Sequence, residues 1–235
     1  MQFGFKRRRS PSELPRLRGR GESSAVRVEF TDLHPDTSTY LGQAAFLQLS
    51  VFEMLSTVSA SMDDLVFSPG VAEAAAVALR KHTALSDEIR RREEDPTSAM
   101  AQPKDAVARF REQTAGGTLE QRVLSVYVTA GILDDLFLGL ASSLPSDISK
   151  RVTAILVEDN RRDVLRQYLQ ASIQTSPGIA SMLALWGRRL VGDTLLLAHT
   201  VVPVENGVTE ERVEPVFTEL IAAHTRRMDS LGLTA

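Results

Sequence analysis

The chain has 235 residues, 43% of them hydrophobic and 24% charged, a composition typical of globular proteins that bury a core without cross-links. It contains no cysteine, which excludes disulfide scaffolds, thiolate zinc sites, iron–sulfur clusters and cysteine nucleophiles. Because no run of about 18 to 20 apolar residues and no secretory signal is evident, we expect a cytoplasmic protein without a membrane span.

The net charge of −3 is distributed unevenly along the chain. Residues 1–20 hold seven basic side chains and one acidic one, whereas the remainder holds 20 basic and 29 acidic residues. The seven basic residues are Lys6, Arg7, Arg8, Arg9, Arg16, Arg18 and Arg20. Residues 1–25 show little apolar periodicity, which predicts a disordered arm. Such an arm binds the phosphates of a nucleic acid, the ribosome or an anionic lipid, or it is a solubilising extension; the sequence alone leaves both open.

From residue 37 onward the sequence is typical of successive helices. One apolar stripe runs from Val71 through Ala75, Ala78 and His82 with helical spacing, and similar stripes follow. The predicted helices span residues 37–61, 69–92, 104–113, 118–142, 145–173, 179–202 and 213–230, with a polar loop before residue 104. Long helices joined by short connections predict an all-α fold, namely an antiparallel bundle within a domain of residues 36–235.

Several polar side chains fall within the apolar parts of these helices. They are Gln48, His82, the pair Asp134 and Asp135, and the charged run that contains Glu158 and Arg161. Each such group costs a few kcal/mol to bury without a partner, so each is partnered, exposed or functional. Two-iron carboxylate bundles use Glu-x-x-His pairs, and the sequence contains none. His82 is therefore either a hydrogen-bonded core residue or, less favourably, a metal ligand.

Two stretches resemble an actinobacterial ferritin-like family that is grouped with tRNA 2-methylthio-N6-isopentenyladenosine hydroxylases. They are Leu183-Ala-Leu-Trp-Gly-Arg-Arg-Leu-Val-Gly192 and His224-Thr-Arg-Arg-Met-Asp-Ser-Leu-Gly232. The resemblance runs from about residue 41 to residue 233. It implies a ferritin-like four-helix bundle with additional C-terminal helices. The hydroxylases of this group use a non-haem two-iron centre and oxygen, so the resemblance also implies such a centre.

The resemblance also indicates which residues stand at the family's metal-ligand positions. They are Gln48, Leu79, His82, Asp135, Glu158 and Arg161. Only three of the six retain a metal-ligand type, and Arg161 is a permanent cation without a lone pair to offer. We therefore expect a degenerate site without metal, the alternative being a centre with two irons.

Removing iron would leave Asp135 and Glu158 without a counter-charge inside the bundle. We therefore predict that Arg161 is the internal cation, with Gln48 and His82 completing the hydrogen bonds. The alternative is a rotated helix on which Arg161 and Arg162 are solvated. The favoured function is a binding or scaffolding module, with an RNA or protein partner or a second copy as candidates. The runner-up is a two-iron hydroxylase acting on a modified tRNA adenosine.

Overall fold

A computed structural model of the chain describes residues 30, 33–158, 161–202 and 210–234. The predicted basic arm, with its seven cationic side chains, lies outside the described residues. Within the described part the chain forms nine α-helices and no strand, which confirms the predicted all-α class. They are α1 (Thr37–Ala60), α2 (Ser68–Arg91), α3 (Pro96–Ala101), α4 (Lys104–Gln113), α5 (Leu119–Ala141), α6 (Ser146–Val157), α7 (Arg161–Thr175), α8 (Pro177–Val201) and α9 (Glu210–Asp229).

The local sequence explains where the long helices begin. The Asp36 carboxylate accepts a hydrogen bond of 2.8 Å from the backbone N–H of Thr39 and so caps α1. At the start of α5, Thr118 and Gln121 form a reciprocal capping box. A proline in the first turn, where no intrahelical N–H is needed, favours the start of α2.

Two predictions about the helices were wrong. The segment 145–173 is not one helix, because Glu158 leaves the helical conformation with ψ of 111° and α7 begins at Arg161. The residues between them in the sequence, an aspartate and an asparagine, belong to the types that favour caps and turns over helix interiors. The segment before residue 104 is not all loop, since Asp95 caps the short helix α3 by accepting from Thr97 and Ser98.

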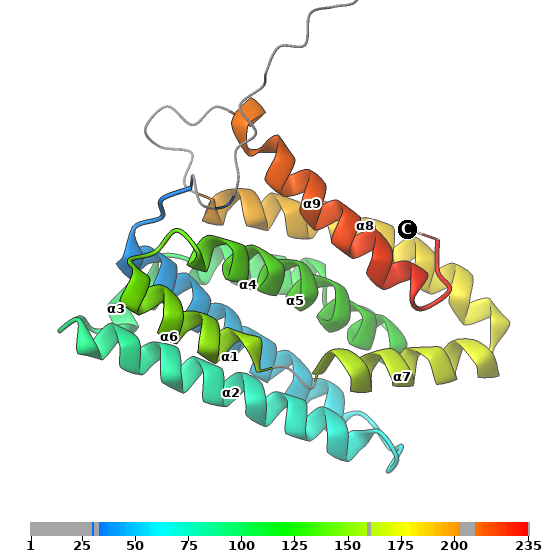
Figure 1. Cartoon of the computed structure of the whole chain (residues 1–235). Helices are drawn as coiled ribbons and strands as arrows, with labels where there is room; N and C mark the ends of the chain where they lie inside the picture. Colours follow the sequence, from blue (N-terminus) through cyan, green and yellow to red (C-terminus); the bar gives the residue numbers. More distant parts are fainter. Residues whose placement is uncertain (1–29, 31–32, 159–160, 203–209, 235) are drawn as a thin grey trace, which may run out of the picture.

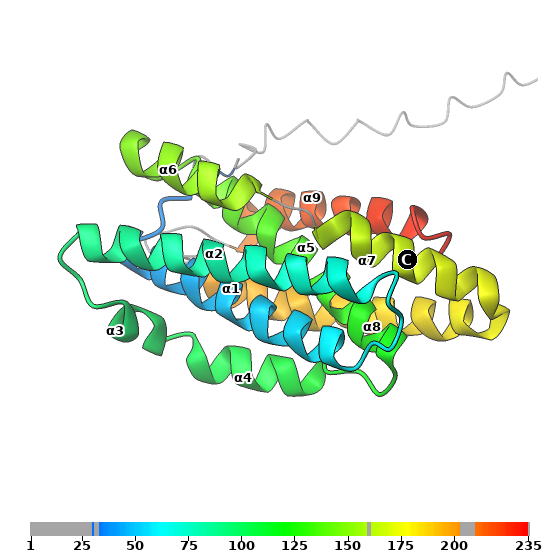
Figure 2. The same cartoon turned by 90° about the horizontal axis from the view of Figure 1, so that it is seen from below.

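Four helical positions surround the interior of the bundle. Helices α1 and α2 form an antiparallel hairpin, α5 packs on α1, and α6 and α7 share the fourth position against α2 and α5 (Figure 1). Helices α8 and α9 pack on another side of α5, and α4 contacts α8. Seen from below, α3 and α4 lie along the outer edge of the bundle (Figure 2). Helix α5 therefore lies at the centre of the molecule.

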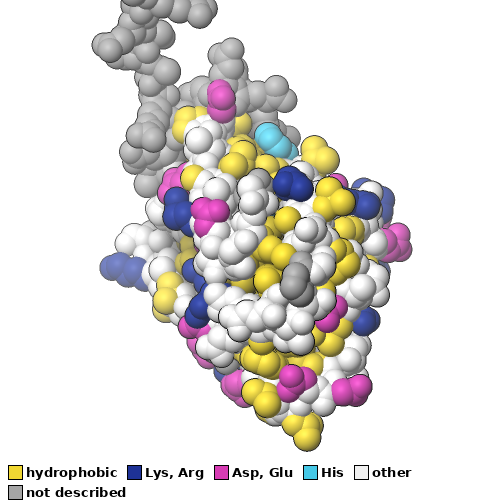
Figure 3. All heavy atoms as spheres, turned by 90° about the vertical axis from the view of Figure 1, so that its right-hand side faces the viewer, with side chains coloured by type: hydrophobic (Ala, Val, Ile, Leu, Met, Phe, Trp, Pro, Cys, Tyr) yellow, Lys and Arg dark blue, Asp and Glu magenta, His cyan; other side chains and the backbone are white. Residues whose placement is uncertain are grey.

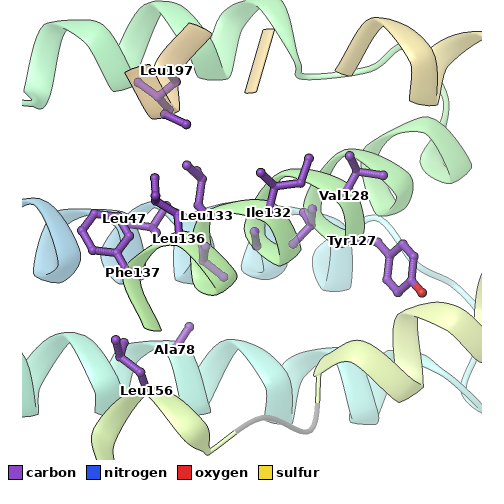
Figure 4. Packing of buried hydrophobic residues seen from close by; sticks show 14 of the residues in the cluster. Leu47, Ala78, Tyr127, Val128, Ile132, Leu133, Leu136, Phe137, Leu156 and Leu197 are labelled. Carbon is purple, nitrogen blue, oxygen red and sulfur yellow. The ribbon is translucent and has the colours of Figure 1, made fainter. Parts of the chain in front are cut away.

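The buried apolar core forms around α5. Side chains of α5 lie beside Leu47 of α1, with Leu197 of α8 above them and Leu156 of α6 below (Figure 4). These α5 side chains are Leu133, Leu136 and Phe137. Among the described helices, α5 alone is long and apolar enough by composition to cross a membrane, and 83% of its most apolar window is buried inside the bundle. A helix packed against five others is apolar on every side, because each of its faces has to be covered by a neighbour.

Candidate functional site

The polar centre of the bundle is built around the carboxylate of Asp134 on α5. Arg161, the first residue of α7, donates from Nη2 to Oδ2 of this carboxylate. Gln48 of α1 donates from Nε2 to Oδ1 over 3.1 Å. The side chains of Asp134 and Arg161 are each only 7% exposed, so the pair is buried. Three helices thus meet at one buried carboxylate.

The neighbouring Asp135 faces away from this centre. Arg227 of α9 donates from Nη2 to Oδ2 of Asp135 and, over 3.0 Å, to the backbone carbonyl of Gly131. A Cβ at position 131 would lie only 2.8 Å from Nε of Arg227, so glycine is what lets the guanidinium approach the α5 backbone. Arg162 lies 3.7 Å from Asp135 on the more exposed side. Asp135 therefore joins α5 to α9 instead of facing the bundle interior.

The predicted partners of Arg161 are corrected by this geometry. Arg161 is the buried internal cation, but it pairs with Asp134 and not with Asp135 or Glu158. Glu158 ends α6, has a side chain 56% exposed, and binds Arg80 across 3.0 Å. The alternative of a solvated Arg161 is wrong, whereas its neighbour Arg162 is 51% exposed.

The two remaining candidate positions, both on α2, take no part in the network around Asp134. Nδ1 of His82 lies 2.9 Å from the carbonyl oxygen of Ala45, so the ring acts as a hydrogen-bonded residue between α1 and α2. Leu79 is 38% exposed. Instead, α2 contributes Lys81, a buried residue that the sequence analysis overlooked. Its Nζ donates over 2.8 Å to the carbonyl of Leu156, where a cation complements the negative end of α6.

The side chains at the six positions do not fit a two-iron centre. Such centres draw four carboxylates and two histidines from the helices that face the bundle interior. Among the described residues two carboxylates are buried, and neither is free: Asp134 binds a guanidinium and an amide, and Glu88 pairs with Arg91 and Arg151. Gln48 Oε1 has no hydrogen-bond partner in the described part, yet one amide oxygen beside a cation is a poor site for a divalent ion. Within that part, no three Asp, Glu, His or Cys side chains form a group able to hold a metal.

A second polar feature lies on α9, one turn before Arg227. His224 is 2% exposed, and both of its ring nitrogens are without a hydrogen-bond partner among the described residues. Burial, together with the positive charge of Arg227, lowers the pKa of His224 to about 4. His224 is therefore held as a neutral imidazole.

The sequence was compared with known protein families, and one family matches. Residues 36–211 match the family described as a ferritin-like domain of actinomycetes. The chain belongs to this family. No curated protein matches the chain. The matched range of this ferritin-like chain contains Gln48, Asp134 and Arg161, whereas His224 and Arg227 lie beyond it.

Removing the internal cation should destabilise the protein strongly. We expect Arg161→Ala to lower the free energy of unfolding by about 3–5 kcal/mol, because it leaves the buried Asp134 carboxylate uncompensated. Denaturant unfolding at neutral pH measures the change. The matched control is Arg162→Ala, which removes a mostly exposed cation from the same turn and should cost less than about 1 kcal/mol.

A double variant separates charge compensation from packing. Arg161→Met combined with Asp134→Asn removes both charges while an amide still accepts from Gln48, so we expect it to regain at least about half of the loss. A loss below about 0.5 kcal/mol for Arg161→Ala would contradict the role of Arg161 as internal cation.

The neutral His224 predicts a pH dependence of stability. In the unfolded chain its pKa lies near 6.5, so between pH 6.5 and pH 4 the unfolded state binds more protons than the folded state. The contribution of His224 to the free energy of unfolding is complete above pH 6.5. As the pH falls to 4, this contribution decreases by about 3 kcal/mol. His224→Leu should remove this component from the pH dependence of the free energy of unfolding, measured by denaturant unfolding at several pH values. His34→Leu, at an exposed histidine, should leave it; the same slope in both variants would contradict the assignment.

Proposed function

We propose that this ferritin-like chain is a metal-independent binding or scaffolding protein. The observation that supports the proposal is that Arg161 and Gln48 bind the Asp134 carboxylate, since the resemblance places both residues at metal-ligand positions of the family. A guanidinium supplies positive charge to the interior but cannot bind oxygen or change its oxidation state. The bundle then serves to hold surfaces and cavities in place and carries out no oxidation.

The alternative is the two-iron hydroxylase acting on a modified tRNA adenosine, which the resemblance to tRNA hydroxylases suggests. That activity requires anionic ligands facing one another in the interior. In this chain Glu158 is exposed and Asp135 is bound to Arg227, so two of the three remaining ligand types lie elsewhere. The arrangement therefore favours the metal-independent function.

Metal analysis distinguishes the two functions. Protein purified without chelator should contain well below one equivalent of iron, manganese or zinc per chain. Added ferrous iron under nitrogen should leave the melting temperature unchanged, because only ligands that bind the folded state raise it. Chelator treatment is the matched control and should also have no effect. About two irons per chain, with oxygen-dependent hydroxylation of a tRNA carrying the modified adenosine, would overturn the proposal.

A second candidate function is RNA binding through residues 1–20. Its support is the seven cationic side chains in this segment of an otherwise acidic protein. At the end of the molecule near the α7–α8 turn, charges of both signs are interspersed with apolar side chains (Figure 3), so that end presents no single basic patch. Phosphate contacts would in this proposal come from the N-terminal segment.

Replacing all seven basic residues by glutamine tests this candidate while keeping the chain length. We expect binding to a labelled single-stranded RNA to weaken by about tenfold or more, and its dependence on salt concentration to become shallower, because fewer counterions are released. Fluorescence anisotropy at several salt concentrations measures both quantities. Unchanged affinity and slope would show that the segment is a solubilising extension.

A further inference from the structure

A cleft of about 550 Å³ lies between α1, α4 and α5. Its volume is in the range of sites that bind small organic molecules. Figure 2 shows α4 on the outer side of the bundle, across from α1. Five apolar side chains line the cleft, namely Met54, Val58, Ala108, Ala115 and Val126. The walls of the cleft therefore favour a ligand with an apolar part.

One cationic side chain in this lining has no counter-charge among the described residues. Arg122, in the first turn of α5, is half-buried and lines the cleft. Its guanidinium makes no hydrogen bond or ion pair with the described residues, and its Nε atom is buried without a partner. Buried polar groups in folded proteins are nearly always paired, so this one calls for an explanation.

The other charged residues around the cleft do not supply the missing partner. Arg111 of α4 is bound to Glu53 of α1, so this pair is neutral as a whole. Glu112 also lines the cleft, but it is exposed and forms no ion pair with Arg122. An anion entering the cleft would thus meet an unpaired guanidinium next to an apolar wall.

We propose that this cleft binds an amphipathic anion, a molecule with an apolar chain or ring system and one carboxylate. The carboxylate pairs with the Arg122 guanidinium, and the apolar part packs against Met54, Ala108 and Ala115, the apolar lining residues with accessible side chains. This inference rests on the proposed binding function and gives that function a site and a class of ligand.

Residues 1–20 of the chain are a poor occupant of the cleft. This segment carries the same sign of charge as Arg122, and its acidic residue is outnumbered seven to one. Charge complementarity therefore favours a small anion over the N-terminal segment. A peptide of residues 1–25 is therefore tested as a competitor for the cleft.

Calorimetric titration of the full chain with three ten-carbon probes tests the proposal. Decanoate, decanol and decylammonium are linear molecules with the same number of carbon atoms and differ chiefly in the charge of the head group. We expect saturable binding of decanoate, weaker binding of decanol and the weakest binding of decylammonium. Failure of decanoate to bind saturably would overturn the proposal.

Two variants separate the roles of the guanidinium and the apolar wall. Arg122→Gln should weaken decanoate binding by about 10- to 100-fold, the effect of losing a charge-assisted hydrogen bond, and leave decanol binding within about twofold. Arg109→Gln removes an exposed charge from α4 outside the cleft and should leave the affinities for decanoate and decanol unchanged. Ala108→Phe fills the cleft from an exposed position and should abolish binding of both probes. Circular dichroism checks that each variant folds.

Three further results would overturn the proposal. They are equal loss of decanoate and decanol binding in Arg122→Gln, undiminished binding in Ala108→Phe, and displacement of decanoate by the peptide of residues 1–25. The metal analysis is an independent measurement. Iron in the bundle would overturn the metal-independent function even if decanoate binds, and absent decanoate binding would overturn this site even if the protein holds no metal.

Discussion

The buried carboxylate of Asp134 imposes the constraint that organises this molecule. An ionised carboxylate in an apolar interior costs several kcal/mol unless a cation and hydrogen-bond donors compensate it. The compensating cation is Arg161, which can reach the bundle centre because the fourth helical position is divided into α6 and α7. The interruption of the helix and the buried ion pair are therefore two parts of one arrangement.

The same constraint links the bundle to the C-terminal helices. Asp134 and Asp135 are adjacent on α5 and point to different sides, one toward α1 and α7, the other toward α9. Lys81 adds a third buried cation at the end of α6. Cationic side chains thus stabilise the interior of this ferritin-like chain at several points. This accounts for a polar centre that lacks a set of carboxylates facing one another among the described residues.

The proposed ligand cleft is spatially separate from this polar centre. Arg122 and Asp134 lie on the same helix, 12 residues apart, which corresponds to about 18 Å along the axis. The guanidinium of Arg161 has a buried carboxylate as its partner, whereas that of Arg122 has none among the described residues. Both residues are arginines, so their surroundings and not their residue type distinguish the structural cation Arg161 from Arg122, which is available to a ligand.

The sequence by itself determined the helical class and most helix boundaries, and it favoured a buried Arg161 over a solvated one. These follow from local rules, since apolar periodicity, capping residues and the cost of burying a charge act along one helix or at one residue. Tertiary structure alone decided that Asp134 and not Asp135 faces Arg161, that Glu158 reaches solvent, and that Arg227 packs over Gly131. The physical reason is that α5 is covered on all sides, so its apolar pattern does not show which neighbour each aspartate meets. Gly131, in the middle of an apolar helix, was the one local signal of a close approach there.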